Sequence, residues 1–195
     1  MADVDYYLSL NSPWSYLGHD RFVAMAKAAG ASVRLWPVDF GVIFPQTGGL
    51  PVPKRSPQRQ AYRLQELTRW RDHLGVPLNL HPAHWPSDDT VATGIVMAAR
   101  DDGHDAIALA GAYMRAVWAE ERDIGDEATA LAIAGENGID GAALRPRVDA
   151  CIEQRNADSL AAIELGVFGA PYYVIGDQVF WGQDRLDFVE RALNR

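Results

Sequence analysis

The sequence predicts an α/β fold in which the two ends of the chain form one sheet and a large all-helical insertion separates them. A strand–helix–strand pattern occupies residues 3–39, and a strand–strand–helix pattern follows residue 171. Between them, apolar residues recur mainly at helical spacing. We therefore assign residues 1–40 and 166–195 to one α/β domain and residues 41–165 to a loop followed by helices.

The beginning of the chain has the pattern of a β-α-β unit. Residues 4–10 are short and aromatic-rich, residues 15–29 are alanine-rich, and residues 32–39 again favour a strand. Ser12 and Pro13 therefore lie in the turn before the first helix, where the missing N–H of a proline is harmless. The free N–H groups and the helix dipole at such a turn favour a sulfur or oxygen anion.

The end of the chain supplies the remaining strands, because one β-α-β unit cannot complete a sheet. Residues 172–175 and 178–181 are β-prone and flank Gly176-Asp177, a pair typical of a two-residue hairpin loop. A last helix is predicted over residues 184–193.

The insertion is predicted to be a loop and then helices. Residues 41–57 are rich in glycine and proline, which indicates a loop. Five helical segments follow, and in the last of them we expect a break near Pro146 and a stop at Gly166. These segments are residues 58–74, 91–100, 105–120, 126–137 and 140–165.

Composition excludes several classes of protein. A net charge of −8 disfavours a nucleic-acid surface, because phosphate binding needs clustered Lys and Arg. No apolar run approaches the ~20 residues of a membrane helix, and no secretory signal is recognisable. The single cysteine, Cys151, excludes an intramolecular disulfide and fits a reducing compartment. We therefore expect a cytoplasmic protein without nucleic-acid or membrane partners.

The histidines do not indicate a metal site. His81 and His84 have no Cys or third His nearby, so we expect no bound metal.

Residues 12–15 (Ser-Pro-Trp-Ser) have the spacing of a thioredoxin-type Cys-X-X-Cys dithiol but carry hydroxyl groups. Two other segments should meet this turn at the carboxyl edge of the sheet. One is 166–171, where a cis Pro171 would present the backbone of Ala170 to an extended peptide. The other is 180–186, at the start of the last helix. A short thiol peptide such as glutathione would find an activating hydroxyl, a backbone edge and polar groups there.

These motifs resemble the 2-hydroxychromene-2-carboxylate isomerase family of the thioredoxin superfamily, which is related to kappa-class glutathione transferases and DsbA-type oxidoreductases. The resemblance covers almost the whole chain and implies a thioredoxin-like fold with a large all-helical insertion of the DsbA/kappa type. It also implies glutathione as cofactor, an aromatic carboxylate as substrate, a role in aromatic-compound degradation and a homodimer. The matching segments are 12–17, 166–171, 182–185, Arg59 with Tyr62, and Arg69-Trp70.

By this resemblance Ser12 is the catalytic residue and contacts the glutathione sulfur. The thiolate would add reversibly to the conjugated substrate, let the former double bond rotate, and leave. The residues implied to hold glutathione are Ala170, Pro171, Gln183, Asp184 and Arg59, and the aromatic residues near the substrate are Trp14, Tyr16 and Tyr62. The chain departs from the family at Gly49, where relatives often have Asn, so a contact made by that asparagine is absent.

Each of these residues also has an ordinary structural interpretation. Ser12 and Asp184 are suited to capping the first and last helices, and Pro171 to beginning a strand in the trans form. Two other functions fit the same motifs. A kappa-like glutathione transferase would release its adduct, whereas a thioredoxin-fold module that only binds peptides would have no affinity for glutathione.

Overall fold

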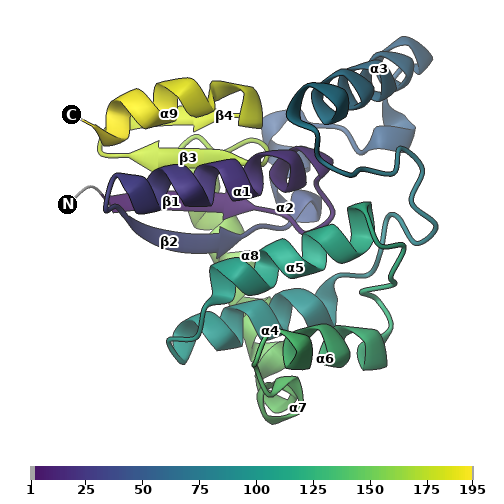
Figure 1. The fold of residues 1–195 in the computed structure, drawn as a ribbon, viewed down its shortest axis with the longest axis vertical. Coiled ribbons are helices and arrows are strands. Elements are labelled where there is room, and N and C mark those ends of the chain that lie inside the picture. The colour runs from purple at the N-terminus through teal and green to yellow at the C-terminus, as the bar shows by residue number, and fades with distance from the viewer. Residues whose placement is uncertain (1–2, 195) are drawn as a thin grey trace.

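The computed structural model describes residues 3–194 and contains one four-stranded sheet with the strand order β2-β1-β3-β4 (Figure 1). The strands are β1 (Asp3–Leu8), β2 (Ser32–Pro37), β3 (Tyr172–Ile175) and β4 (Gln178–Trp181). β1 and β2 pair in parallel, whereas β1–β3 and β3–β4 are antiparallel. The pairing of Tyr6 with Tyr173 joins the two ends of the chain, as the sequence predicts.

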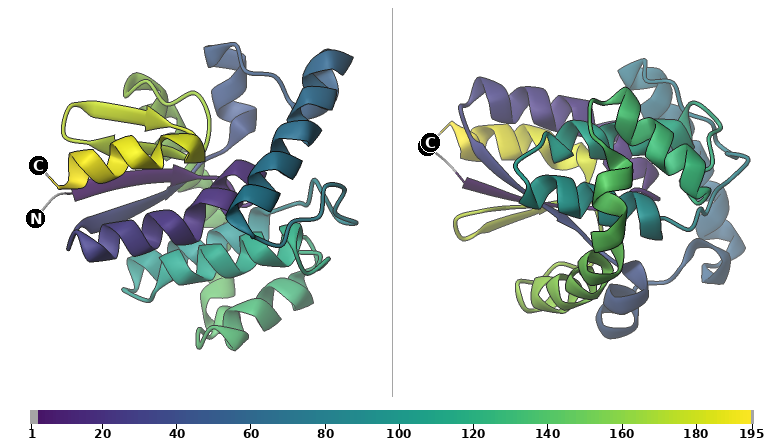
Figure 2. Two further views of the ribbon diagram at one scale, coloured as in Figure 1. Left: turned by 45° about the horizontal axis from the view of Figure 1, so that its top comes forward. Right: turned by 90° about the horizontal axis from the view of Figure 1, so that it is seen from below.

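The helices form a layer on each face of the sheet and a bundle beside it. α1 (Pro13–Ala28) and α9 (Leu186–Leu193) cover one face, and α8 (Val148–Glu164) covers the other with α2 (Phe40–Thr47) (Figure 2). The remaining helices are α3 (Pro57–Leu74), α4 (Thr90–Asp101), α5 (Ala106–Trp118), α6 (Glu127–Glu136), α7 (Gly141–Leu144) and the short 3-10 helices η1 (Val52–Lys54), η2 (Arg145–Arg147) and η3 (Gln183–Arg185). The thioredoxin-like fold with its helical insertion is therefore confirmed.

Alternation along β1 divides the apolar core between the two faces. Tyr6 points to the α1 and α9 side, where its ring stacks with that of Tyr173 at 5.3 Å and meets Phe22 at 4.6 Å. Tyr7 points to the other face and packs with Ile43 of α2 and Val167 after α8. The sheet is therefore fixed on both sides, and this holds the loops at its carboxyl edge in place.

The prediction of a loop over residues 41–57 is wrong for residues 41–47, because α2 occupies Phe40–Thr47. Asp39 caps the helix by accepting a hydrogen bond from the Gly41 N–H at 2.6 Å, and Gly48 ends it in the left-handed conformation at φ 77°. The buried Ile43 anchors the helix beneath α8. The glycine and proline content concealed these local signals.

The other boundaries follow the sequence closely. η2 interrupts the helical run between α7 and α8 at the expected position near Pro146, and Gly166 follows α8 with φ 84°. The last helix begins at Leu186 instead of residue 184, because η3 precedes it. Within the described residues, none of the helices has the length and apolar character that crossing a membrane requires.

Candidate functional site

Ser12 lies between β1 and α1 and makes two hydrogen bonds with its side chain. The hydroxyl oxygen accepts from the Ser15 N–H at 3.1 Å, which caps α1. The hydroxyl also donates to the carbonyl of Ala170 at 3.3 Å, and the two residues are 158 positions apart in the sequence, on either side of the insertion. With 4% of its surface exposed, Ser12 is a buried group at a helix N-terminus, where the dipole of α1 favours negative charge.

Pro171 follows a cis peptide bond, so the trans alternative is excluded. The cis bond sits directly before β3, and the Pro171 carbonyl accepts a hydrogen bond from the Gly182 N–H at 2.9 Å. The segments around Ser12, Ala170 and Gly182 therefore meet at one edge of the sheet, as the motifs predict.

A fourth segment reaches the same edge and was not foreseen from the sequence. The Asn11 side chain exchanges two hydrogen bonds of 3.0 Å with the backbone of Ser87, and the Trp85 indole N–H donates to the Asn11 carbonyl at 2.9 Å. The Trp85-Pro86 bond in this loop is also cis. The loop before α4 thus forms one wall beside Ser12.

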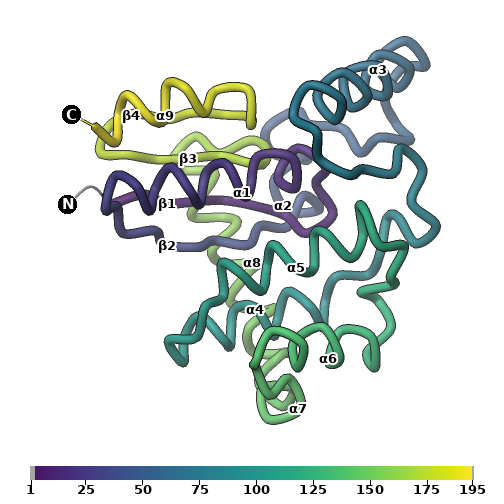
Figure 3. The backbone as a smooth tube through the Cα atoms, viewed as in Figure 1, coloured from purple at the N-terminus to yellow at the C-terminus, as the bar shows by residue number. Residues whose placement is uncertain are grey.

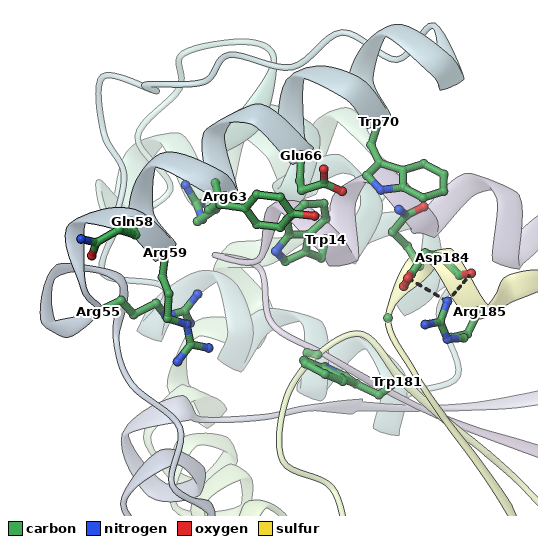
Figure 4. Close-up of a pocket in the computed structure, with 14 residues that line it drawn as sticks. Trp14, Arg55, Gln58, Arg59, Arg63, Glu66, Trp70, Trp181, Asp184 and Arg185 are labelled. Carbon is green, nitrogen blue, oxygen red and sulfur yellow. Dashed lines mark hydrogen bonds and ion pairs between the residues drawn. The ribbon is translucent and has the colours of Figure 1, made fainter.

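The segments enclose a cleft with two adjacent lobes, and Figure 4 shows the side chains that line the polar one. The polar lobe, of about 610 Å³, lies under α3, which extends past the carboxyl end of β1 (Figure 3). The apolar lobe, of about 510 Å³, lies between α2 and the loop of Trp85. Both lobes share Trp14, Arg55, Arg59, Arg63, Ala170 and Trp181. The polar lobe adds Gln58, Tyr62, Glu66, Trp70, Gly182, Gln183, Asp184 and Arg185, and the apolar lobe adds mainly Ser12, Phe40, Phe44, Leu50, Val52, Trp85, Pro86 and Phe168.

Most of the residues singled out from the sequence line this cleft. Ser12 borders the apolar lobe, and Trp14, Tyr62, Arg59, Ala170, Gln183 and Asp184 border the polar one. Pro171 lines neither lobe, and neither does Tyr16. Its hydroxyl donates to the Pro77 carbonyl at 2.8 Å, and burial raises its pKa to about 12. Tyr16 therefore fastens the loop after α3 to α1, and its expected contact with a substrate is not supported.

Comparisons with known proteins agree with this geometry. A family model described as a DSBA-like thioredoxin domain matches residues 3–194. The chain belongs to the DSBA-like thioredoxin family. A 2-hydroxychromene-2-carboxylate isomerase of Pseudomonas sp. (strain C18) is 30% identical over 197 residues, which span 97% of this chain and 89% of that protein.

Solved structures give the same result. A 2-hydroxychromene-2-carboxylate isomerase structure superposes with a TM-score of 0.83 at 28% identity, covering 99% of this chain and 95% of the other. The cytosolic disulfide reductase DsbM from Pseudomonas aeruginosa shares the fold, with a TM-score of 0.69 at 21% identity over 97% and 93% of the two chains. The family resemblance that the motifs indicate is confirmed.

In this member of the DSBA-like thioredoxin family, Asp184 does not cap the last helix. No side chain caps η3 or α9, and the Asp184 carboxylate instead pairs with the Arg185 guanidinium at 2.9 Å, at the rim of the polar lobe. Gln183 is 1% exposed, and its carbonyl oxygen accepts from Arg21 at 3.0 Å. Gln183 packs so close to α1 that a side chain at Gly18 would begin 2.6 Å from it. These contacts fix the polar lobe against α1.

Sequence patterns did not assign three features to the cleft, namely Arg55, Arg63 and the loop of Trp85. The arginines had a visible signal, because Arg59 and Arg63 lie four residues apart and share one face of α3. Among residues 3–194, no carboxylate forms an ion pair with Arg55, Arg59 or Arg63. The cleft therefore carries uncompensated positive charge although the whole chain has a net charge of −8.

The two serines of the motif should contribute unequally to stability. Ser12→Ala loses the helix cap and the bond to Ala170, so its free energy of unfolding should fall by about 1–2 kcal/mol. Ser15→Ala is the matched control. The Ser15 hydroxyl is buried without a hydrogen-bond partner, so its removal should leave stability unchanged or slightly higher. Urea denaturation followed by circular dichroism measures both values, and equal losses in the two variants would contradict the assignment.

Proposed function

We propose that this chain is a glutathione-dependent isomerase of aromatic carboxylates of the 2-hydroxychromene-2-carboxylate type, acting in the degradation of aromatic compounds. The observation that carries the proposal is the cleft at Ser12, which has a lobe suited to a charged peptide beside a lobe suited to an aromatic ring. A relative at 30% identity is a 2-hydroxychromene-2-carboxylate isomerase, which supports the reaction. We also propose that the protein is cytoplasmic, as its composition predicts, and forms a homodimer, as the resemblance implies.

The residues of the polar lobe fit glutathione by charge. Glutathione carries two carboxylates and one ammonium group, and the lobe presents cations at Arg59 and Arg185 and carboxylates at Glu66 and Asp184. The backbone of Ala170, beside the cis bond, offers an edge for the cysteinyl part of an extended peptide. Glutathione bound there supplies a thiolate for reversible addition to the conjugated double bond of the substrate.

Ser12 has the geometry to hold that sulfur as its anion. Its hydrogen bond to the Ala170 carbonyl, at 3.3 Å, is longer than the usual range for O–H···O bonds. The hydroxyl proton can therefore turn easily from this carbonyl toward a bound sulfur. The oxygen meanwhile keeps accepting from the Ser15 N–H, which holds the hydroxyl in place. Ser12 acts in this scheme as a hydrogen-bond donor and not as a covalent nucleophile.

The magnitudes are sufficient for this role. A free thiol has a pKa of ~8.5, and lowering it by about two units requires ~2.7 kcal/mol of preference for the thiolate. One hydrogen bond to a charged group contributes ~1.5–3 kcal/mol and the N-terminus of α1 ~0.3–1 kcal/mol.

The apolar lobe suits a flat aromatic substrate next to the sulfur. Ser12 lies at its border, and the aromatic side chains of Phe40, Phe44, Trp85 and Phe168 line it. Such a lining excludes water from the reacting atoms and orients a planar ring.

Product analysis tests the reaction directly. The protein is incubated with 2-hydroxychromene-2-carboxylate and a small fraction of an equivalent of glutathione. We expect many turnovers per glutathione, giving an equilibrium mixture of the substrate and an isomer of unchanged mass with the glutathione recovered, as followed by liquid chromatography and mass spectrometry. An accumulating glutathione adduct would establish a transferase instead, and the absence of both turnover and glutathione binding would favour a peptide-binding module.

Asp184→Asn tests recognition of the γ-glutamyl end. Because Asp184 does not cap a helix, the melting temperature should stay unchanged. The affinity for glutathione should fall several-fold, since the ligand ammonium loses its carboxylate partner. Isothermal titration calorimetry measures the affinity, and Asp187→Asn, an exposed carboxylate on α9, is the control. An unchanged affinity in Asp184→Asn would remove this residue from the proposed site.

A further inference from the structure

Arg63 is a buried cation at the boundary of the two lobes. It is 8% exposed and projects from α3 (Figure 4). Its side chain lines both the polar and the apolar lobe. Its guanidinium carbon lies 5.0 Å from the ring centre of Trp85 and 6.0 Å from that of Trp118. The two indoles therefore hold the planar group in a fixed position.

The charge of Arg63 has no counterpart in the described part of the chain. Its Nη2 atom is buried without a hydrogen-bond partner, and no carboxylate pairs with it among residues 3–194. Burial, and then the charge of Arg55, lower the pKa of Arg63 to about 10. An unpaired cation in such a position is costly to the protein, so an anion that reaches it gains binding energy.

A second buried arginine, in contrast, has its charge balanced by carboxylates of the protein. Arg155, on α8, pairs with Asp39 at 3.1 Å and with Asp89 at 3.0 Å. Two carboxylates from different segments thus balance Arg155, whereas Arg63 faces an open cleft. The contrast indicates that the partner of Arg63 comes from outside the chain.

Neither neighbouring arginine is equally suited to receive that anion. Arg59 is exposed at the surface of α3, where water screens its charge. Arg55 already donates from Nε to the Leu50 carbonyl at 2.7 Å. Arg63 alone combines burial, fixed orientation and an unused donor among these three.

We propose that Arg63 binds the carboxylate of the aromatic substrate from the inner side of the apolar lobe, and so selects anionic over neutral aromatic compounds. The inference rests on the proposed function and adds the residue that recognises the substrate. A guanidinium fork matches a carboxylate in two parallel hydrogen bonds, and the aromatic lining then receives the ring attached to it.

Two ligands of equal shape test this selection without the reaction. 2-Naphthoate carries the carboxylate, and 2-naphthamide replaces it with a neutral amide. By isothermal titration calorimetry, the wild-type protein should bind 2-naphthoate about tenfold or more tightly than 2-naphthamide, as expected for hydrogen bonds to a charged group. In Arg63→Met the preference should shrink to less than about twofold.

Arg71→Met, on the same helix but outside both lobes, is the matched control and should keep the full preference. The melting temperature separates recognition from a structural role. Removal of an unpaired buried charge should leave it unchanged or higher, and 2-naphthoate should raise it in the wild type but not in Arg63→Met.

Equal affinity of the wild type for the two naphthyl ligands would overturn the inference, even if the isomerase reaction is observed. Retention of the preference in Arg63→Met would overturn it as well. Failure of the isomerase assay together with a clear preference for 2-naphthoate would refute the proposed reaction and leave the anion site standing. If Arg63→Met does not fold, Arg63→Gln, which removes the charge and keeps a polar side chain, replaces it in the same comparison, and a preference retained in that variant would overturn the inference.

Discussion

The hydrogen bond from the Ser12 hydroxyl to the Ala170 carbonyl connects the two ends of the chain at the point where the cleft forms. Ser12 belongs to the first β-α-β unit, and Ala170 precedes the strands that complete the sheet. The pairing of β1 with β3 brings them together, and the apolar contacts on both faces of the sheet keep them there. The cleft therefore depends on this junction more than on any single helix of the insertion.

The insertion contributes the walls of the cleft and its charge. α3 brings Arg59 and Arg63, and the loop before α4 brings Trp85, which packs over Arg63. An acidic protein thereby acquires a local positive field in one concave site, which attracts anionic ligands and keeps them from the rest of the surface. The same elements separate the polar lobe from the apolar lobe.

The sequence was most informative where local chemistry alone decides the structure. Ser12 before a proline at a helix start, and Pro171 before a short strand, are features of a few neighbouring residues, and both stand where the motifs predict. α2 was missed because glycine and proline dominate its surroundings, although Asp39 caps it and Ile43 anchors it.

Residues whose role depends on distant partners were beyond the reach of local patterns. The orientation of the Arg63 guanidinium depends on Trp85 and Trp118, which come from other segments. Tyr16 belongs to the motif, yet its direction on α1 takes its hydroxyl to the Pro77 carbonyl and away from the cleft. Whether a helical residue faces the cleft depends on where the other elements pack around its helix, and the local sequence does not contain that information.

The most direct test of the central claim, that the Ser12 hydroxyl stabilises a glutathione thiolate, is the ultraviolet thiolate absorbance of bound glutathione as a function of pH. The wild-type complex should show an apparent thiol pKa about two units below the ~8.5 of a free thiol. Ser15→Ala should retain this low value, because its hydroxyl makes no hydrogen bond, whereas Ser12→Ala should return the thiol pKa most of the way to that of a free thiol. An identical thiol pKa in the wild type and in Ser12→Ala would contradict the claim.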